Sequence, residues 1–364
     1  MIDQKLLNIF LDLIKLDGLS NQEKNVALYV KNFLTKFPVK ISEDSSQSET
    51  KSNTGNIICE IGNGGDFLMV SHMDTARSTL KVKPVLLDDR ITSDGTTVLG
   101  VDNRAGIAVL LYLVDQIFTQ NIPIKNFTIA FTTCEETTLF GSKHLSIKSK
   151  IKKGFIFDSG YRPGNFIFSA CGAIGFKIKV IGKASHSGIA PEKGINSLQI
   201  AANAISQLRL GRIDEETTMN IGIMKSGSAV NVIPESTELE GEVRSFNLKN
   251  ADTNYKLLEK IFKSEAKKHK AKIEAEYFWD FMPYTISSNS DVYKETVIAI
   301  QKVGLKPTPT ISLGGSDANS LNARGIESVN LGIGAQNPHS NDEFIFIEDL
   351  VNSAEIAIEL VRKQ

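Results

Sequence analysis

Residue types that bind metal ions recur at five places along this sequence, and each place adjoins an apolar segment. In chain order they are His72 with Asp74, Asp102, Glu135 with Glu136, Asp158, and His339. Imidazole nitrogens and carboxylate oxygens together form a mixed ligand set that Zn²⁺ accepts. A bound dication activates water and polarises carbonyl groups, so the chemistry that this set indicates is metal-assisted hydrolysis.

Each of these clusters, taken alone, has an ordinary structural explanation. Asp102 precedes a strong helical pattern, and aspartate is a favoured residue at helix starts. Adjacent acids such as Glu135 and Glu136 are usually a solvated surface pair. The recurrence of histidines and carboxylates beside predicted strands favours a metal site over these separate explanations.

The candidate ligands need a framework that brings distant segments together, and the apolar pattern predicts one. Short apolar runs typical of strands cover residues 55–61, 67–71, 127–133 and 154–157, and a helix is predicted over 103–118. This alternation indicates an α/β layer fold with a partly parallel sheet. Ligands bind beyond the carboxyl ends of the strands in such sheets, and three of the five clusters lie at such ends.

The segment before this sheet predicts two amphipathic helices, over residues 2–15 and 22–36. The pair Ser20 and Glu23 is typical of a capping box at the start of the second helix. A polar, serine-rich stretch at 42–54 is predicted to be a loop.

A different pattern begins near residue 174. Strands are predicted over 174–182, 217–224, 236–246 and 272–279, with helices over 195–209 and 251–268. The resulting β-α-β-β-α-β order is the ferredoxin-like arrangement. The α/β pattern then returns, with helices over 291–303 and 347–362 and short strands near 309–312 and 327–332. We therefore expect a discontinuous domain, residues 1–173 and 284–364, with a compact domain of residues 174–283 inserted into it.

The overall composition excludes several classes of function. The chain has 364 residues, 41 Lys+Arg against 42 Asp+Glu, and a formal net charge of −1, which argues against a nucleic-acid binder. The N-terminus lacks a signal-peptide pattern, and the longest apolar run, 107–114, is far too short to cross a membrane. The three cysteines show no C-x-x-C spacing. A reduced, cytoplasmic enzyme or binding protein is expected.

Taken in order, the clusters resemble the motifs of the M20 metallopeptidase family. The motifs are His72-x-Asp74, Gly100-Val101-Asp102-Asn103-Arg104-Ala105-Gly106, Glu135-Glu136, Asp158 and His339. Residues 94–100 and 314–319 look typical of its peptidase T-like (tripeptidase-like) branch. The resemblance covers essentially the whole chain. It implies a zinc-peptidase-like α/β/α catalytic domain with an inserted ferredoxin-like lid and dimerisation domain.

The resemblance also implies a role for each residue of the motifs. It places one zinc on His72 and Asp158, a second on Glu136 and His339, and Asp102 as the bridge between them. Asp74 would fix the ring orientation of His72, and Glu135 would be the general base. Because this ligand set is complete, Cys134 is interpreted as a small residue that fills a tight strand end rather than as a ligand.

In the inserted domain the resemblance implies three substrate contacts. His186 would reach the active site of the opposite subunit of a homodimer, and Asn231 would contact a substrate carbonyl or carboxylate group. From the residues alone, Arg244 on a predicted strand is most simply a solvated or salt-bridged side chain. The resemblance favours a carboxylate clamp instead, since the guanidinium fork fits a carboxylate bidentately.

The function expected from these arguments is that of a cytoplasmic dizinc peptidase that releases the N-terminal residue of short peptides, as a tripeptidase does. Manganese or cobalt could replace zinc. One alternative is an N-acyl-amino-acid deacylase or desuccinylase, because the same site cleaves any amide whose carbonyl reaches the metals. A second alternative is a non-catalytic peptide-binding module, but pure binding needs no general base such as Glu135.

Overall fold

The computed structural model describes residues 2–148 and 150–363. Its internal contacts divide the chain into two units. The first unit consists of the chain up to Ser169, residues Thr285–Ser312, and the chain from Ser316 onward. The second consists of Ala170–Tyr284 together with Leu313–Gly315. The second unit is therefore inserted into the first in sequence.

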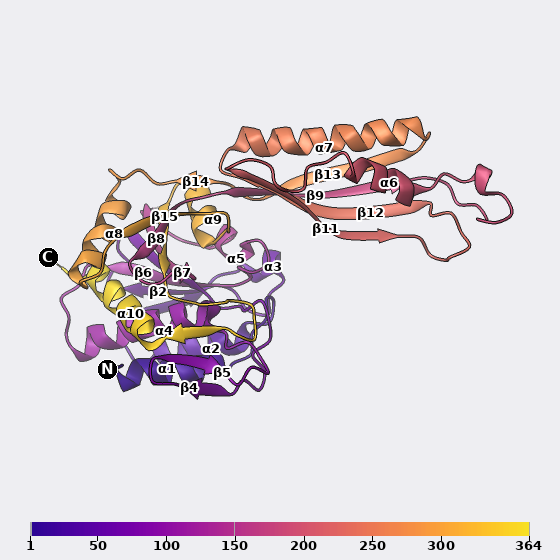
Figure 1. Ribbon diagram of the computed structural model, residues 1–364. Coiled ribbons are helices and arrows are strands. Elements are labelled where there is room, and N and C mark those ends of the chain that lie inside the picture. The colour runs from indigo at the N-terminus through magenta and orange to yellow at the C-terminus, as the bar shows by residue number, and fades with distance from the viewer. Residues whose placement is uncertain (1, 149, 364) are drawn as a thin grey trace. The chain divides into compact units, whose positions relative to one another are not determined.

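A large mixed sheet forms the centre of the first unit (Figure 1). Its path is β1 (Lys40–Glu43), β2 (Ile57–Ile61), β6 (Phe127–Thr132), β3 (Phe67–His72), β7 (Lys153–Ser159), β16 (Glu327–Gly332), β8 (Asn165–Ala170) and β14 (Tyr284–Thr285), and β15 (Thr308–Ser312) pairs with β8. The four central strands β6, β3, β7 and β16 are parallel. Strands β3 and β6 are buried along their whole length, as expected for parallel strands covered on both faces.

Helices cover both faces of this sheet, which confirms the predicted α/β/α layers (Figure 1). On one face α4 (Val101–Thr119) packs against β3 and β7, and α1 (Gln4–Ile14), α2 (Lys24–Leu34) and α10 (Ile347–Val361) pack against α4. On the other face α9 (Asp317–Ala323) packs against β7 and β16, beside α5 (Phe140–Lys143). Helix α8 (Asp291–Lys302) packs against β16 and α10. Helix α4 is buried on nearly all sides because it lies between the sheet and other helices.

Several short elements were not predicted from periodicity. A separate sheet contains β4 (Pro84–Leu86), β5 (Arg90–Ser93) and β17 (Phe344–Phe346), in the order β17-β5-β4. Part of the expected loop at 42–54 is instead the end of β1 and a one-turn helix, α3 (Gln47–Thr50). Strands of three or four residues are too short to show an alternating pattern.

The second unit has the predicted ferredoxin-like order. Its elements are β9 (Gly172–Ile181), the 3₁₀ turn Pro191–Lys193, α6 (Ser197–Ile205), β10 (Gly211–Arg212), β11 (Thr217–Ser226), β12 (Ser236–Ser245), α7 (Leu248–Lys268) and β13 (Lys272–Phe281). The sheet order is β10-β11-β12-β9-β13, with antiparallel neighbours. Both helices lie on the same face of this sheet (Figure 1).

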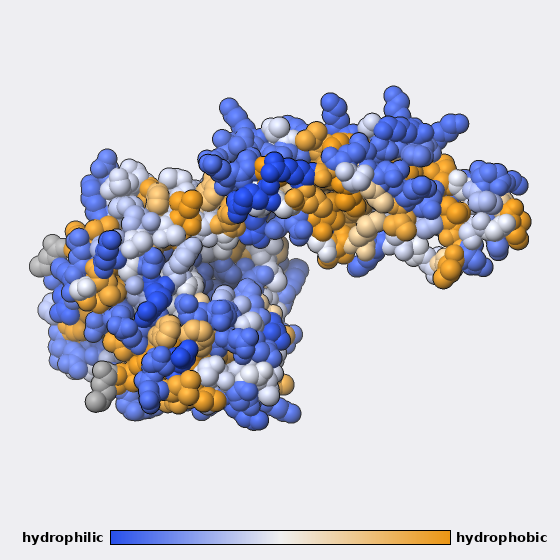
Figure 2. Space-filling model, in the orientation of Figure 1, coloured by the Kyte–Doolittle hydropathy of each residue, from blue (hydrophilic) through white to orange (hydrophobic). Residues whose placement is uncertain are grey.

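Helix α7 shows why this unit folds as it does. Its buried residues recur every three or four positions and include Tyr255, Leu258 and Phe262, which join the core beneath it. Figure 2 shows hydrophilic residues along the outer side of this helix. The helix is therefore held by one apolar stripe against the sheet.

The long segment Ala170–Tyr284 leaves and rejoins the first unit at one place. Ser169 at the end of β8 and Thr285 in β14 are 116 positions apart in sequence, yet their hydroxyl oxygens are 2.7 Å apart. The next residue, Ile286, donates its N–H to the carbonyl of Phe168 at 2.8 Å. Among the residues described, no helix combines the length and the apolar character needed to cross a bilayer.

Candidate metal centre

Three adjacent parallel strands carry candidate ligands to one edge of the central sheet. His72 is the last residue of β3 and pairs with Thr132, the last residue of β6. Glu135 and Glu136 lie in the turn after β6, and Asp158 lies near the end of β7. Parallel strands end at the same edge, so segments far apart in sequence meet there.

The first group of ligand atoms surrounds the His72 ring. Its Nε2 atom lies 3.0 Å from Oδ1 of Asp102 and 3.0 Å from Oδ1 of Asp158. The His72 side chain is only 2% exposed. Burial alone would lower the pKa of His72, but the carboxylates of Asp158, Asp102 and Asp74 raise it well above its usual value. This negative potential would equally favour a metal dication.

The second group uses the other oxygen of the same aspartate. His339 Nε2 lies 3.1 Å from Oε1 of Glu136 and 3.4 Å from Oδ2 of Asp102. Hydrogen bonds with Asp102 and Glu136 raise the pKa of His339 to about 10, although its side chain is 49% exposed. Asp102 thus has one oxygen in each group, which is how a carboxylate bridges two ions. In each group the potential ligand atoms lie within 4.8 Å of one another.

The donors fit a pair of dications chemically as well as geometrically. Burial raises the pKa of Asp158 and that of Glu136, and the carboxylate of Asp102 raises both further. Buried carboxylates that lie this close together repel one another. Bound cations would supply the positive charge that offsets this repulsion. The mixed N and O ligand set suits Zn²⁺ and related transition metals.

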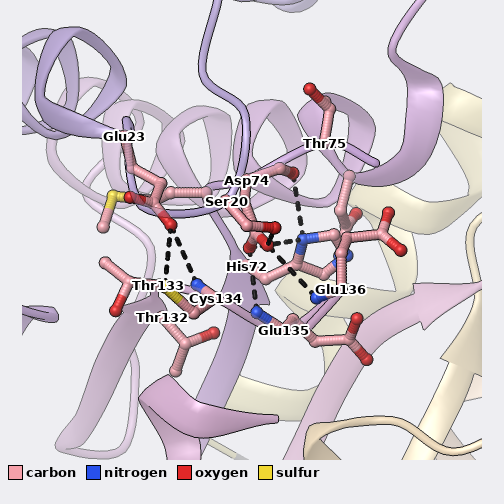
Figure 3. A network of polar contacts seen from close by, with 12 residues as sticks. Ser20, Glu23, His72, Asp74, Thr75, Thr132, Thr133, Cys134, Glu135 and Glu136 are labelled. Carbon is pink, nitrogen blue, oxygen red and sulfur yellow. Dashed lines mark hydrogen bonds and ion pairs between the residues drawn. The ribbon is translucent and has the colours of Figure 1, made fainter. Parts of the chain in front are cut away.

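Asp74 organises the residues around this centre (Figure 3). Its carboxylate accepts the backbone N–H of Glu135 at 3.0 Å and of Glu136 at 3.1 Å, and the Ser20 hydroxyl donates to it at 2.7 Å. The Nδ1 atom of His72 lies 3.1 Å from the Asp74 carbonyl oxygen and 3.4 Å from Oδ1. One buried carboxylate therefore orients the His72 ring and fixes the backbone of both glutamates.

The predicted capping box is wrong, because its two residues serve this site instead. Glu23 is the N-cap of α2 but makes no side-chain capping bond there. Its carboxylate accepts the Cys134 N–H at 2.9 Å and the Ser52 hydroxyl at 2.5 Å, while Ser20 donates to Asp74. Figure 3 shows Glu23 facing Cys134. Both side chains hydrogen-bond to residues distant in sequence instead of capping the helix locally.

Cys134 occupies the sharp turn that follows β6. It is buried with φ at +52°, and its Sγ lies 3.3 Å from Oε1 of Glu23. Burial, with the charges of Glu23 and Asp74, raises the pKa of the Cys134 thiol to about 12. The thiol donates toward Asn21 Oδ1 at 3.1 Å and Glu23, and it belongs to neither group of potential ligand atoms.

The Glu135 side chain differs from its neighbours. Within the described ranges, 2–148 and 150–363, its carboxylate makes no hydrogen bond or ion pair. Burial raises its pKa well above the usual value, and the charges of Asp158, Asp317 and Glu136 add to this, whereas His72 opposes it. A buried carboxyl group with a raised pKa and no fixed partner is suited to proton transfer.

Three residues that support the site were not singled out from the sequence. Asn103 donates to Asp158 Oδ1 at 2.8 Å, and the fully buried Arg104 donates to the carbonyls of Met73 and, at 3.1 Å, Leu16. A signal existed for both, because a polar pair interrupts an apolar helix directly after Asp102. Glu343 accepts the backbone N–H groups of Gly100 and Asp102, and no local sequence pattern predicts this role.

The three candidate substrate contacts all lie in the second unit. His186 and Asn231 are exposed and occupy neighbouring loops, joined by the Ser187 N–H that donates to the Asn231 carbonyl at 3.0 Å. His186 Nδ1 accepts two backbone N–H groups at 3.2 Å. Arg244 is already engaged, since it pairs with both oxygens of Glu242 at 2.9 and 3.0 Å and donates to the Leu313 carbonyl at 2.9 Å.

Comparison with known proteins gives two matching family models. An M20 peptidase dimerisation domain matches residues 168–270, and peptidase family M28 matches residues 56–190. The crystal structure of a tripeptidase from Staphylococcus aureus has a TM-score of 0.93 and 32% identity, over 99% of this chain and 98% of that one. The aminopeptidase PepT from Bacillus cereus has a TM-score of 0.88 and 31% identity, over 99% and 98%. Peptidase T from Haemophilus influenzae is 27% identical over 75% of this chain and 66% of its own length.

Proposed function

The chain is a peptidase of the M20 family, in its peptidase T-like branch, and on that premise we propose that it is a dimetal aminopeptidase that releases the N-terminal residue of tripeptides. The observation that carries the proposal is the pair of ligand groups that share Asp102, with the carboxylate of Glu135, which has no hydrogen-bond partner among the residues described, beside them. The tripeptidase and PepT similarities support the peptide substrate.

The two groups support an assignment of the ligands. His72 and Asp158 would hold one ion, Glu136 and His339 the other, and Asp102 both. Bound Zn²⁺, or Mn²⁺ or Co²⁺ in its place, would polarise the scissile carbonyl and lower the pKa of water to near neutrality. Side chains of the protein transfer the proton and orient the ligands. Glu135 takes the proton of the attacking water and passes it to the leaving amine, while Asp74 keeps the His72 ring in its ligating orientation.

The division of labour between the units forms part of the proposal. Residues 1–173 and 284–364 would form the catalytic domain, and residues 174–283 the lid and dimerisation domain of a homodimer. The match to the dimerisation domain supports this. His186 and Asn231 would contact substrate from that domain. Arg244 would bind a substrate carboxylate only by sharing or releasing its ion pair with Glu242.

A substrate panel tests the proposal. Purified protein loaded with Zn²⁺, Mn²⁺ or Co²⁺ is assayed against free tripeptides, dipeptides, N-terminally blocked tripeptides and N-acetyl amino acids. The expected result is release of the N-terminal residue from free tripeptides and loss of activity when that terminus is blocked. Preferred hydrolysis of N-acyl amino acids would assign a deacylase instead, and a chain that binds peptides without cleaving them would be a binding module.

A further inference from the structure

Glu343 is a buried acid placed beside a candidate ligand. It is 1% exposed, and its Oε2 accepts the Gly100 N–H at 2.6 Å while Oε1 accepts the Asp102 N–H at 3.1 Å. It forms no salt bridge within residues 2–148 and 150–363. Burying a carboxylate close to other carboxylates is unfavourable, and an apolar side chain would avoid that cost. Its presence therefore calls for a functional explanation.

The backbone that Glu343 holds is the turn that presents Asp102. Gly100 has φ at +79°, and Asp102 and Asn103 depart from helical φ and ψ, so regular helix starts only after them. Within this irregular turn, Arg104 donates its N–H to the Gly100 carbonyl at 3.2 Å. Two hydrogen bonds to one carboxylate fix the N–H groups on both sides of Val101.

The same segment of chain also presents His339. Residues 339–343 are tied to the segment before Asp102, because Asn341 donates to the Gly95 carbonyl at 3.0 Å and Phe344 pairs with Thr92 across β17 and β5. Glu343 thus connects the loop of one candidate ligand to the turn of another. It is placed to set the distance between His339 and Asp102.

The two ligand groups depend on this connection to different degrees. His72 and Asp158 lie on adjacent buried strands of the central sheet, β3 and β7, so their separation is set by the strand pairing. Glu136 and His339 lie on loops, and the His339 side chain is largely exposed. Among the described residues no helix or strand spans the second group, and the contacts across it come from a loop, in which Ala76 donates to Glu136 Oε1 at 3.2 Å and Arg77 donates to the His339 carbonyl at 3.2 Å.

We propose that Glu343 is a positioning residue for the second metal, because it holds the Asp102 turn and the His339 loop in register so that Asp102 faces both ions. The proposal rests on the proposed dimetal function. Loss of a group that orients a ligand typically weakens metal binding about 10- to 100-fold, and here the loss falls mainly on the ion held by Glu136 and His339.

The test is metal binding by Glu343→Gln, which keeps side-chain length but places an NH₂ group against a backbone N–H. Zinc bound per chain is measured across buffers of defined free Zn²⁺, for the wild type, Glu343→Gln and the control Asp342→Asn, which removes the neighbouring exposed charge. We expect two ions per chain in the wild type and control. In Glu343→Gln the weaker of the two binding steps should shift by about 10- to 100-fold and the stronger one by less.

A second variant covers the case in which Glu343→Gln does not fold. Gly100→Ala disturbs the same turn from the other side, since φ is positive there and a Cβ atom would meet Thr79 Cγ2 at 2.7 Å. It should produce the same selective loss. Unchanged binding in both variants, or an equal loss of both ions, overturns the role of Glu343. A wild type that binds one ion or none overturns the dimetal proposal itself.

Discussion

Replacing Glu135 with glutamine tests the proposed mechanism most directly. The backbone N–H of residue 135, which donates to Asp74, is kept, and the carboxylate itself has no hydrogen-bond partner among the described residues. Nothing in the fold therefore depends on the charge. Because burial raises the pKa of this carboxyl group, a neutral amide should not lower the free energy of unfolding. Loss of a general base should slow turnover about 10²- to 10⁴-fold, equivalent to about 3 to 5 kcal/mol in the activation free energy.

The assay measures kcat on a free tripeptide and metal content of the dialysed protein by elemental analysis. Glu136→Gln is the matched control, because the adjacent acid is a proposed ligand and its loss should lower bound metal. We expect Glu135→Gln to keep both ions and lose turnover. Near-normal turnover with full metal content would refute the assignment of Glu135 as base, and loss of metal would make it a ligand instead.

Four further predictions concern individual side chains. His339→Ala should lower bound metal to about one ion per chain by elemental analysis, since the buried His72 group is left intact, and unchanged content would remove His339 from the ligand set. If the chain is a dimer in which His186 serves the partner subunit, mixing inactive His186→Ala with inactive Glu135→Gln should restore activity after verified subunit exchange, because the mixed dimer holds one site with both residues intact. If no activity returns, His186 acts within its own subunit or has no role in the mechanism. Arg244→Met should reduce kcat/KM for free-acid peptides by about ten- to more than hundredfold and leave amidated peptides little changed, because a charge-assisted hydrogen bond contributes about 1.5 to 3 kcal/mol. Equal losses would restrict Arg244 to its ion pair with its own strand. Burial raises the pKa of Asp317 from 3.8 to about 6, so between these values this carboxyl group binds more protons in the folded than in the unfolded chain, and its contribution to stability falls as pH rises through them. In urea denaturation of metal-free protein, Asp317→Asn should remove up to about 3 kcal/mol of that decline, and parallel pH curves would contradict this.

The parts of the fold with long apolar patterns could be predicted from the sequence. Helix α4 and strands β3, β6 and β7 are continuous apolar segments that end in polar residues, so both their type and their approximate ends were expected. The ferredoxin-like order of the second unit was readable for the same reason. The β17-β5-β4 sheet was not, since its strands are only three or four residues long and β17 pairs with β5 about 250 positions away in sequence.

The supporting residues of the site show a second limit. Ser20 and Glu23 match a local helix-capping pattern, but their partners, Asp74 and Cys134, lie 54 and 111 positions away. Glu343 follows two polar residues and looks like part of an exposed turn. Local sequence carries no information about such long-range partners. The individual roles of the candidate ligands came from family resemblance and not from spacing.

Ser169 and Thr285 lie in contact although nearly all of the second unit is synthesised between them. This separation affects how the central sheet can assemble during synthesis. The ribosome releases β7 and β8 first and then nearly all of the second unit, whereas β16, which lies between β7 and β8 in the sheet, is synthesised last of the three. Until β16 is synthesised, β7 is an edge strand of the first unit, with no partner on the side that β16 will occupy. An exposed edge strand can pair with a wrong strand. Because most of the second unit, Ala170–Tyr284, is continuous in sequence, this part can fold during the interval, before Leu313–Gly315 is added, and bring Ser169 and Thr285 together. Strand β16 can enter the sheet between β7 and β8 only after the segment Ala170–Tyr284 has been synthesised, and the loop that carries His339 emerges after that strand.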